Sequence, residues 1–142
     1  MSDPHAIVTE LSENECWALL VAGEFGRFAV AIGSRPEIFP VNYRASDGSI
    51  LIRTAEGTKL FGVGVNDEVA FEVDDYTATE AWSVIVRGRA RVLESPAEIA
   101  EAERVQLRPW ARTPKTRFIR VDAAEVTGRR FTFGSETELA YV

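Results

Sequence analysis

Cationic and hydroxyl-bearing side chains gather in one stretch of the chain, which reads Arg-Thr-Ala-Glu-Gly-Thr-Lys-Leu over residues 53–60. The stretch leaves an expected strand at Arg53 and Thr54 and enters a helical segment at Thr58 and Lys59. A helix N-terminus presents free N–H groups, the hydroxyl and cationic side chains add donors, and a glycine lets backbone approach a ligand. The pattern predicts a phosphate site; the alternative is a solvated turn with surface charges. It is not a P-loop, because the Gly-x-x-x-x-Gly-Lys-Ser/Thr order is absent.

Nucleophiles and metal ligands are scarce in this sequence. It holds one histidine, His5, and one cysteine, Cys16. A Ser/Cys–His hydrolase would have to use that terminal histidine, and neither a cysteine-based nor a multi-histidine metal site can be assembled. Cys16 is expected to be buried and inert beside Trp17, itself a core residue. Asp74-Asp75 is expected to be a strand-ending turn rather than a metal site.

Three arginines, Arg87, Arg89 and Arg91, alternate along one face of an expected strand. We interpret them as a polar face that pairs with the acidic excess of the chain. The alternative is a second anion subsite for a charged substrate or cofactor tail. On the opposite face of the same strand, Trp82 fits either the core or the wall of a cofactor site.

Two helices with capped N-termini must support these segments. Ser12 and Glu15 match a capping box for a helix over residues 12–22, which Gly23 ends. Its apolar face is expected to comprise Trp17, Leu20 and Val21. A second helix is expected to begin at Ser95-Pro96 and to run to about Leu107.

Alternating side chains predict strands at residues 26–33, 37–45, 49–54, 69–73 and 82–93, and one or two more within 117–133. Pro40 marks its strand as an edge or a bulge, and Asp47-Gly48 is a hairpin turn. Residues 55–64 are expected to form a short, poorly regular helix. Because hairpins dominate the connections, the predicted fold class is mainly β, an antiparallel sheet that closes into a small barrel with few helices.

Composition sets outer limits on function. The chain has 142 residues with 46% hydrophobic and 27% charged side chains, which predicts one soluble globular domain over residues 1–142. A net charge of -6 argues against non-specific nucleic-acid binding. We see neither a signal-peptide pattern nor an apolar run that could span a membrane, so the expected location is cytoplasmic.

The order and spacing of six segments carry a family resemblance. They are Leu-Ser-x-x-Glu-Cys-Trp-x-Leu-Leu at 11–20, Gly-Arg-Phe-Ala-Val at 26–30, Phe-Pro-Val-Asn-Tyr at 39–43, Arg-Thr-x-x-Gly-Thr-Lys-Leu at 53–60, Val-Ala-Phe-Glu-Val-Asp at 69–74 and Trp-Ser-Val-x-Val-x-Gly-x-Ala at 82–90. Residues 11–93 thereby resemble the small FMN-binding split-barrel proteins related to pyridoxamine 5'-phosphate oxidase, including the nitroimidazole-reductase-like members. The last third of the chain is generic.

The resemblance implies a six-stranded split β-barrel that forms a homodimer with FMN in two clefts at the interface. Carried over by position, Arg53, Thr54, Thr58 and Lys59 would hold the FMN phosphate and the ribityl or ring edge. Residues that would line the isoalloxazine are Pro40, Val41, Asn42 and Tyr43. Glu72 or Asp74 would lie on the neighbouring strand, and Trp82 and Ser83 would approach from the partner subunit.

The resemblance leads to an FMN-dependent oxidoreductase that acts on a small molecule, with NAD(P)H as a transient electron donor. The hydride chemistry belongs to the flavin, so no protein nucleophile or base is required. The arginine and histidine that a pyridoxamine phosphate oxidase uses for its substrate have no counterpart here, and vitamin B6 oxidation is not predicted. The alternatives are a non-catalytic flavin-binding or flavin-sequestering protein and a deazaflavin-dependent reductase; haem is a further cofactor of related barrels.

Overall fold

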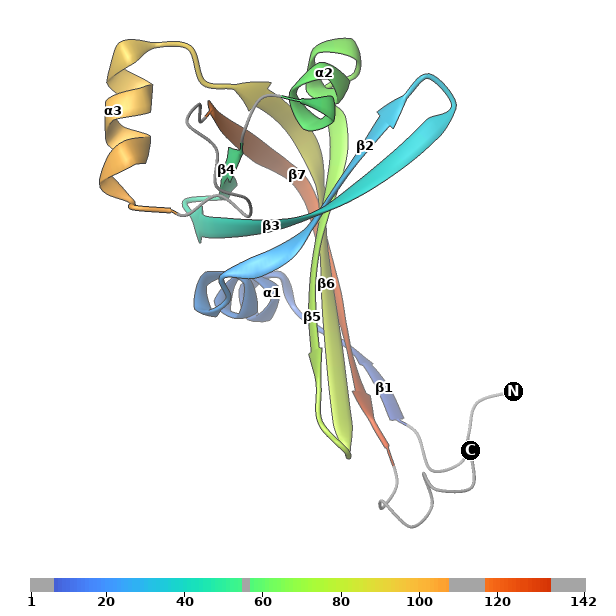
Figure 1. Ribbon diagram of the computed structural model, residues 1–142. Helices are drawn as coiled ribbons and strands as arrows, with labels where there is room; N and C mark the ends of the chain where they lie inside the picture. The colour runs from blue at the N-terminus through green and yellow to red at the C-terminus, as the bar shows by residue number, and fades with distance from the viewer. Residues whose placement is uncertain (1–6, 55–56, 108–116, 134–142) are drawn as a thin grey trace.

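Seven strands and three helices make up the described part of the chain, residues 7–54, 57–107 and 117–133 of a computed structural model. The side chains of residues 58–61 lie outside that description. In chain order the elements are β1 (Ile7–Glu10), α1 (Glu13–Ala22), β2 (Phe25–Ile32), β3 (Arg35–Ser46), β4 (Ser49–Thr54), α2 (Thr58–Val65), β5 (Glu68–Tyr76), β6 (Glu80–Val92), α3 (Pro96–Arg104) and β7 (Arg117–Thr132) (Figure 1).

Six of the strands close into a ring in the order β7-β4-β3-β2-β5-β6, with β6 returning to β7. Every pairing is antiparallel. The pairing of β2 with β5 is short, Arg27–Ala29 against Ala70–Glu72, so the barrel is split on that side. β6 and β7, by contrast, pair over nearly their whole length. The predicted mainly β fold, a six-stranded antiparallel split barrel, is confirmed, and β1 joins the edge of β7 as a seventh strand that the sequence did not reveal.

Apolar side chains fill the barrel interior. The largest fully buried ones include Tyr43, Phe28 and Phe71. The rings of Tyr43 and Phe71 meet edge to face with centroids 4.8 Å apart. α1 packs against β3, β6 and β7 and buries Cys16 and Leu20 there. A smaller apolar cluster lies between α3 and the sheet and comprises Leu51, Leu93, Ala102, Leu107 and Phe118.

Local signals in the sequence produce several of these elements as expected. The Ser12 hydroxyl accepts from the Glu15 N–H at 3.1 Å, and the Ser12 N–H donates to the Glu15 carboxylate at 3.0 Å, so the capping box is complete. Asp47 and Gly48 have φ of 50° and 76°, the pair of positive values that a tight hairpin turn requires. β4 follows directly with the predicted bounds. Pro40 lies where β3 pairs with β2 alone, which confirms the predicted edge.

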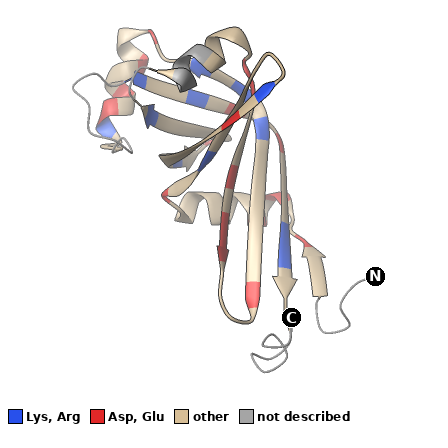
Figure 2. Cartoon of the chain, turned by 45° about the vertical axis from the view of Figure 1, so that its right-hand side comes forward, with Lys and Arg blue, Asp and Glu red and all other residues tan. Residues whose placement is uncertain are grey.

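β5, β6 and β7 extend beyond the barrel as an arm, to which β1 adds a fourth strand (Figure 1). We define the arm as residues 7–10, 73–84 and 127–132. Residues that pair across its four strands form rows. One row comprises Asp74, Ser83, Arg129 and Glu10, and a neighbouring row on the same face comprises Tyr76, Ala81, Phe131 and Val8. Figure 2 marks acidic residues in red on β5 and basic residues in blue on β7, on either side of β6.

Several sequence expectations need correction. The second helix ends at Arg104 rather than near Leu107, because Gln106 adopts a φ of 57° that no α-helix accommodates. Of the one or two strands expected within 117–133, the chain forms one, over residues 117–132. Val21 is 56% exposed and does not belong to the buried face of α1, whereas Cys16 is buried there as predicted. Asp74 and Asp75 lie within β5, which continues to Tyr76. No helix in the described ranges is long and apolar enough to cross a membrane.

Candidate functional site

Arg53 and Thr54 end the central strand β4, which pairs with β3 on one side and β7 on the other. Thr54 is 4% exposed. The Arg53 guanidinium donates to the Leu107 carbonyl oxygen at 3.1 Å and lies 5.7 Å from the centroid of the Phe118 ring. The turn after α3 and strand β7 therefore hold this guanidinium beside the end of β4.

The start of α2 differs from the starts of the other two helices. Ser12 and Ser95 cap α1 and α3 with side-chain hydrogen bonds, whereas Gly57 leaves α2 without one, and the first turn of α2 has no acidic residue. The φ of 154° and ψ of -154° at Gly57 belong to a region that only glycine populates freely. This helix start can therefore accept an anion. Thr58 and Lys59 open α2, but their side chains lie outside the described residues.

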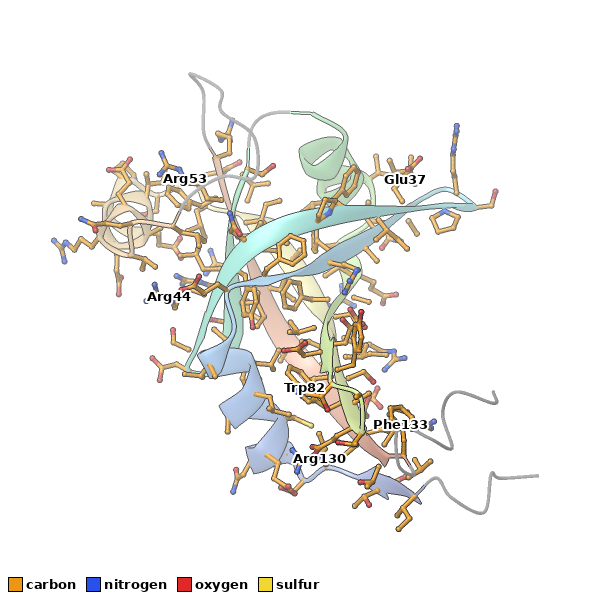
Figure 3. The ribbon with its side chains drawn as sticks, turned by 60° about the horizontal axis from the view of Figure 1, so that its bottom comes forward. Glu37, Arg44, Arg53, Trp82, Arg130 and Phe133 are labelled. Atoms are coloured by element: carbon orange, nitrogen blue, oxygen red, sulfur yellow. The ribbon has the colours of Figure 1, made fainter. Side chains whose placement is uncertain are left out.

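The segment Pro40–Tyr43 alternates between the barrel interior and its surface. Val41 and Tyr43 point inward, with 1% and 0% exposure, so only their backbone is available to a ligand. Asn42 is half-buried and borders a cavity of about 200 Å³ together with Arg44, Gln106 and Leu107. Because Leu107 also accepts the hydrogen bond from Arg53, Asn42 and Arg53 lie on the same side of the barrel. Figure 3 shows Arg44 and Arg53 together on the side of α3.

Glu72 lies on β5 in a small charge cluster with Asp74 and Arg27. The Arg27 guanidinium is 2.7 Å from the Glu72 carboxylate and 3.2 Å from that of Asp74. Burial and the hydrogen bond with Asp74 raise the pKa of Glu72, while the hydrogen bond from Glu72 lowers the pKa of Asp74. The two carboxyl groups can thus share a proton. Sequence reasoning missed Arg27 as their partner; its cross-strand place opposite Glu72 follows only from the sheet register.

Trp82 and Ser83 lie far from the end of β4 within one chain. Trp82 packs in part against the barrel core and pairs with Arg130 on β7, whereas Arg53 pairs with Phe118 on the same strand. Twelve residues separate Phe118 from Arg130 along β7, which is about 40 Å of extended strand. Figure 3 shows Arg53 beside α3 and Trp82 apart from it, on β6. One chain therefore brings Arg53, Thr54, Asn42 and the start of α2 together, but not Trp82 and Ser83.

The three arginines on the outer face of β6 do not behave alike. Arg89 is 2.9 Å from Asp67, and Arg91 is 2.8 Å from Glu98. For these two, the predicted pairing with acidic residues is confirmed. Arg87 has no ion-pair partner among the residues that the structure describes.

Comparison with known proteins identifies relatives over most of the chain. Residues 12–130 match the family described as pyridoxamine 5'-phosphate oxidase. The structure of an FAD binding protein from Mycobacterium smegmatis is 46% identical, with 89% of this chain and 100% of that chain covered and a TM-score of 0.76. An FAD-binding protein from Mesorhizobium loti is 25% identical, with coverages of 89% and 98% and a TM-score of 0.79. An uncharacterised protein of Mycobacterium tuberculosis is 31% identical over 138 residues, which span 92% of this chain and 90% of that protein.

Proposed function

This chain belongs to the pyridoxamine 5'-phosphate oxidase family, and from that premise we propose that it binds FMN and uses it for redox chemistry on a small molecule. The observation that carries the proposal is the uncapped start of α2, which follows the strand end at Arg53 and Thr54. A phosphate requires backbone N–H groups, hydroxyls and fixed cations, and this segment supplies that set. The names of the relatives from M. smegmatis and M. loti support a flavin.

The residues would act by binding and orientation. Arg53, Thr54, Thr58 and Lys59 would hold the phosphate, and Asn42 with the backbone of Pro40–Tyr43 would meet the polar edge of the isoalloxazine. The guanidinium of Arg53 is already held by Leu107 and Phe118. Binding a phosphate would therefore cost the Arg53 side chain little further conformational entropy. The bound flavin supplies the hydride chemistry. FAD contains the same isoalloxazine and first phosphate, so this segment suits either flavin.

The remaining predicted contacts argue for a homodimer. Along β7, the residues that pair with Trp82 and Ser83 lie about 40 Å from the residue that pairs with Arg53. This separation is beyond the reach of one flavin. If both groups contact one cofactor, they must come from two copies of the chain. A two-fold axis would then generate two equivalent sites. Glu72 and Asp74 lie near Ser83 and would join the site from that same copy.

Absorbance of the protein as purified tests the cofactor. Flavin bands, with FMN released on denaturation, are the expected result. A colourless preparation that binds deazaflavin but not FMN would assign the other coenzyme, and a Soret band would assign haem. Steady oxidation of NAD(P)H with an added acceptor would show catalysis. Stable flavin binding without turnover would instead indicate a flavin-sequestering protein.

Lys59→Ala is expected to weaken FMN binding without unfolding the protein. A charge-assisted contact to phosphate contributes about 1.5–3 kcal/mol, so the dissociation constant should rise about tenfold to hundredfold. Fluorescence titration of the cofactor-free protein with FMN measures this dissociation constant. Arg35→Ala removes an exposed cation elsewhere, 3.4 Å from Glu37, and should leave the affinity unchanged. Equal FMN affinity in wild type and Lys59→Ala would remove Lys59 from the site.

A further inference from the structure

A second cavity lies on the outer face of the sheet, where the arm joins the barrel between β6, β7 and β1. Its volume is about 500 Å³, which is within the range of small-molecule sites. Ser83, Ile85, Arg87, Thr127, Arg129 and Phe131 are the lining residues that the argument uses, and the acidic residue Glu10 lines the cavity as well. We call it the arm cavity. It contains none of the residues at the end of β4 or the start of α2.

The two arginines of the arm cavity differ from the other arginines of β6 and β7. Neither Arg87 nor Arg129 has a carboxylate within ion-pair distance in the described part of the chain. Their cross-strand neighbours Glu125 and Glu10 do not close a pair with them. Four other arginines of the same two strands form ion pairs: Arg89 with Asp67 at 2.9 Å, Arg91 with Glu98 at 2.8 Å, Arg120 with Glu98 at 3.8 Å and Arg130 with Glu80 at 3.1 Å. Arg117, at the start of β7, is not free either. The two cations that remain available line one cavity.

The lining residues follow one another in a defined order along the strands. On β7, the lining residues Phe131, Arg129 and Thr127 follow one another from the tip of the arm toward the barrel. On β6, their cross-strand partners are Ala81, Ser83 and Ile85, and Arg87 comes two residues after Ile85. From the tip of the arm toward the barrel the cavity therefore offers an aromatic ring, a cation with a hydroxyl, an aliphatic chain with a hydroxyl, and a second cation. The Cα atoms of Ser83 and Arg87 are about 13 Å apart along β6. An elongated ligand with a flat apolar end and several negative charges matches this order.

We propose that the arm cavity binds the ADP moiety of a dinucleotide, with the base against Phe131 and the phosphates between Arg129 and Arg87. Aromatic rings stack on nucleobases, and guanidinium groups bind phosphates with two hydrogen bonds. The inference rests on the proposed function in one respect: Ser83 lines this cavity and is also expected to approach the flavin of the partner subunit. Two sources can present an ADP moiety there, the adenylate half of FAD and that of a nicotinamide dinucleotide donor.

Calorimetric titration of the full-length, flavin-free protein with ADP tests the cavity directly. Arg87→Gln and Arg129→Gln should each weaken ADP binding about tenfold. Arg89→Gln is the matched control: Arg89 lies two residues from Arg87 on the same face of β6 but is paired with Asp67, so affinity should be unchanged. All three variants should melt like wild type, because the side chains are exposed. Wild type that binds no ADP at millimolar concentration, or an equal loss in Arg89→Gln, would overturn the proposal.

The same variants distinguish the two sources of the ADP moiety, FAD and a nicotinamide dinucleotide. A tenfold loss of FAD affinity with FMN affinity unchanged would identify the adenylate of FAD. Unchanged affinity for both flavins with a tenfold loss of NADPH affinity would identify the donor. An equal loss of FMN and FAD affinity would mean that the arginines serve the mononucleotide itself, and this would overturn the proposal. Failure of the proposed function looks different: wild type would bind no flavin and would still bind ADP through Arg87 and Arg129.

Discussion

Tyr43 links the candidate site to the stability of the barrel. Its ring is fully buried against Phe71, and its hydroxyl donates to the Leu20 carbonyl oxygen at 2.6 Å near the end of α1. A Cβ added at Gly23 would collide with that hydroxyl, so the residue that ends α1 must be small. Tyr43 therefore fixes the end of α1 on β3, next to Asn42.

The ionisation of Tyr43 predicts a loss of stability at alkaline pH. Burial raises the pKa of Tyr43 from its usual value of 10.0 to about 12. Because the unfolded chain releases this proton first, the free energy of unfolding should fall as the pH rises from about 10 to about 12. Urea unfolding at pH 8, 10 and 11 measures the change.

Tyr43→Phe is the control for that experiment. It should cost about 1 kcal/mol at pH 8, because the hydrogen bond to Leu20 is lost. The alkaline decline between pH 10 and pH 11 should then be smaller than in wild type. An equally steep decline in Tyr43→Phe would assign the pH dependence to other groups.

Strand β7 holds the barrel and the arm together. One of its edges pairs first with β4 and then with β1, and the other edge pairs with β6. The pairing with β6 contains one irregularity, where Arg87 lies opposite Glu125 and Gly88 lies opposite Ala123, so Ala124 is the extra residue of a bulge. This bulge lies between the barrel and the arm, beside Arg87 of the arm cavity.

Gly88→Ala should destabilise the protein by about 1–3 kcal/mol. A Cβ at residue 88 would collide with the backbone carbonyl of Asp122 and would lie 3.1 Å from the Ala123 Cα, and backbone cannot move aside as a flexible side chain can. Thermal unfolding measures the loss. Gly64→Ala is the matched control, because position 64 lies in α2 with no atom within 4 Å of an added Cβ. It should be neutral or stabilising by up to about 1 kcal/mol. Equal stability of Gly88→Ala and wild type would show that the bulge can relax.

The separation of the predicted contacts makes the oligomeric state part of the proposed mechanism. Arg53 lies beside α3 at the end of β4, whereas Trp82 lies apart from it on the arm. The barrel interior is closed to a flavin, because Phe28, Tyr43 and Phe71 fill it. The proposed cofactor therefore needs a cleft outside the barrel, and in the proposed homodimer a second copy would supply the other wall of that cleft.

We expect light scattering at low micromolar concentration to give a mass near twice the 15.7 kDa of one chain. FMN should be lost when the dimer is diluted into monomer, because each site would lose the partner's Trp82 and Ser83. The fluorescence of released FMN reports this loss in the same dilution series. A mass near 15.7 kDa with FMN still bound would contradict the dimer and would place the whole site in one chain.

Features whose partners are close in the chain were predictable from the sequence. Ser12 and Glu15 cap α1 across three residues, and Asp47-Gly48 turns β3 directly into β4. The alternation of residues 82–92 correctly separated a buried face with Val84 and Val86 from an outer face with the arginines. The family resemblance predicted the split barrel. The roles of Lys59, Trp82 and Ser83 toward a flavin stay predictions.

Features that depend on distant segments needed the folded chain. Residues 7–10 form a strand because β7 offers them an edge, and Val21 is exposed because the sheet packs against the other side of α1. In the sequence, Arg87, Arg89 and Arg91 look equivalent. Only folding brings Asp67 to Arg89 and Glu98 to Arg91 and leaves Arg87 facing a cavity with Arg129. The physical reason is that capping and turn hydrogen bonds act over a few residues, whereas ion pairs, strand edges and cavities arise from register between segments far apart in the chain.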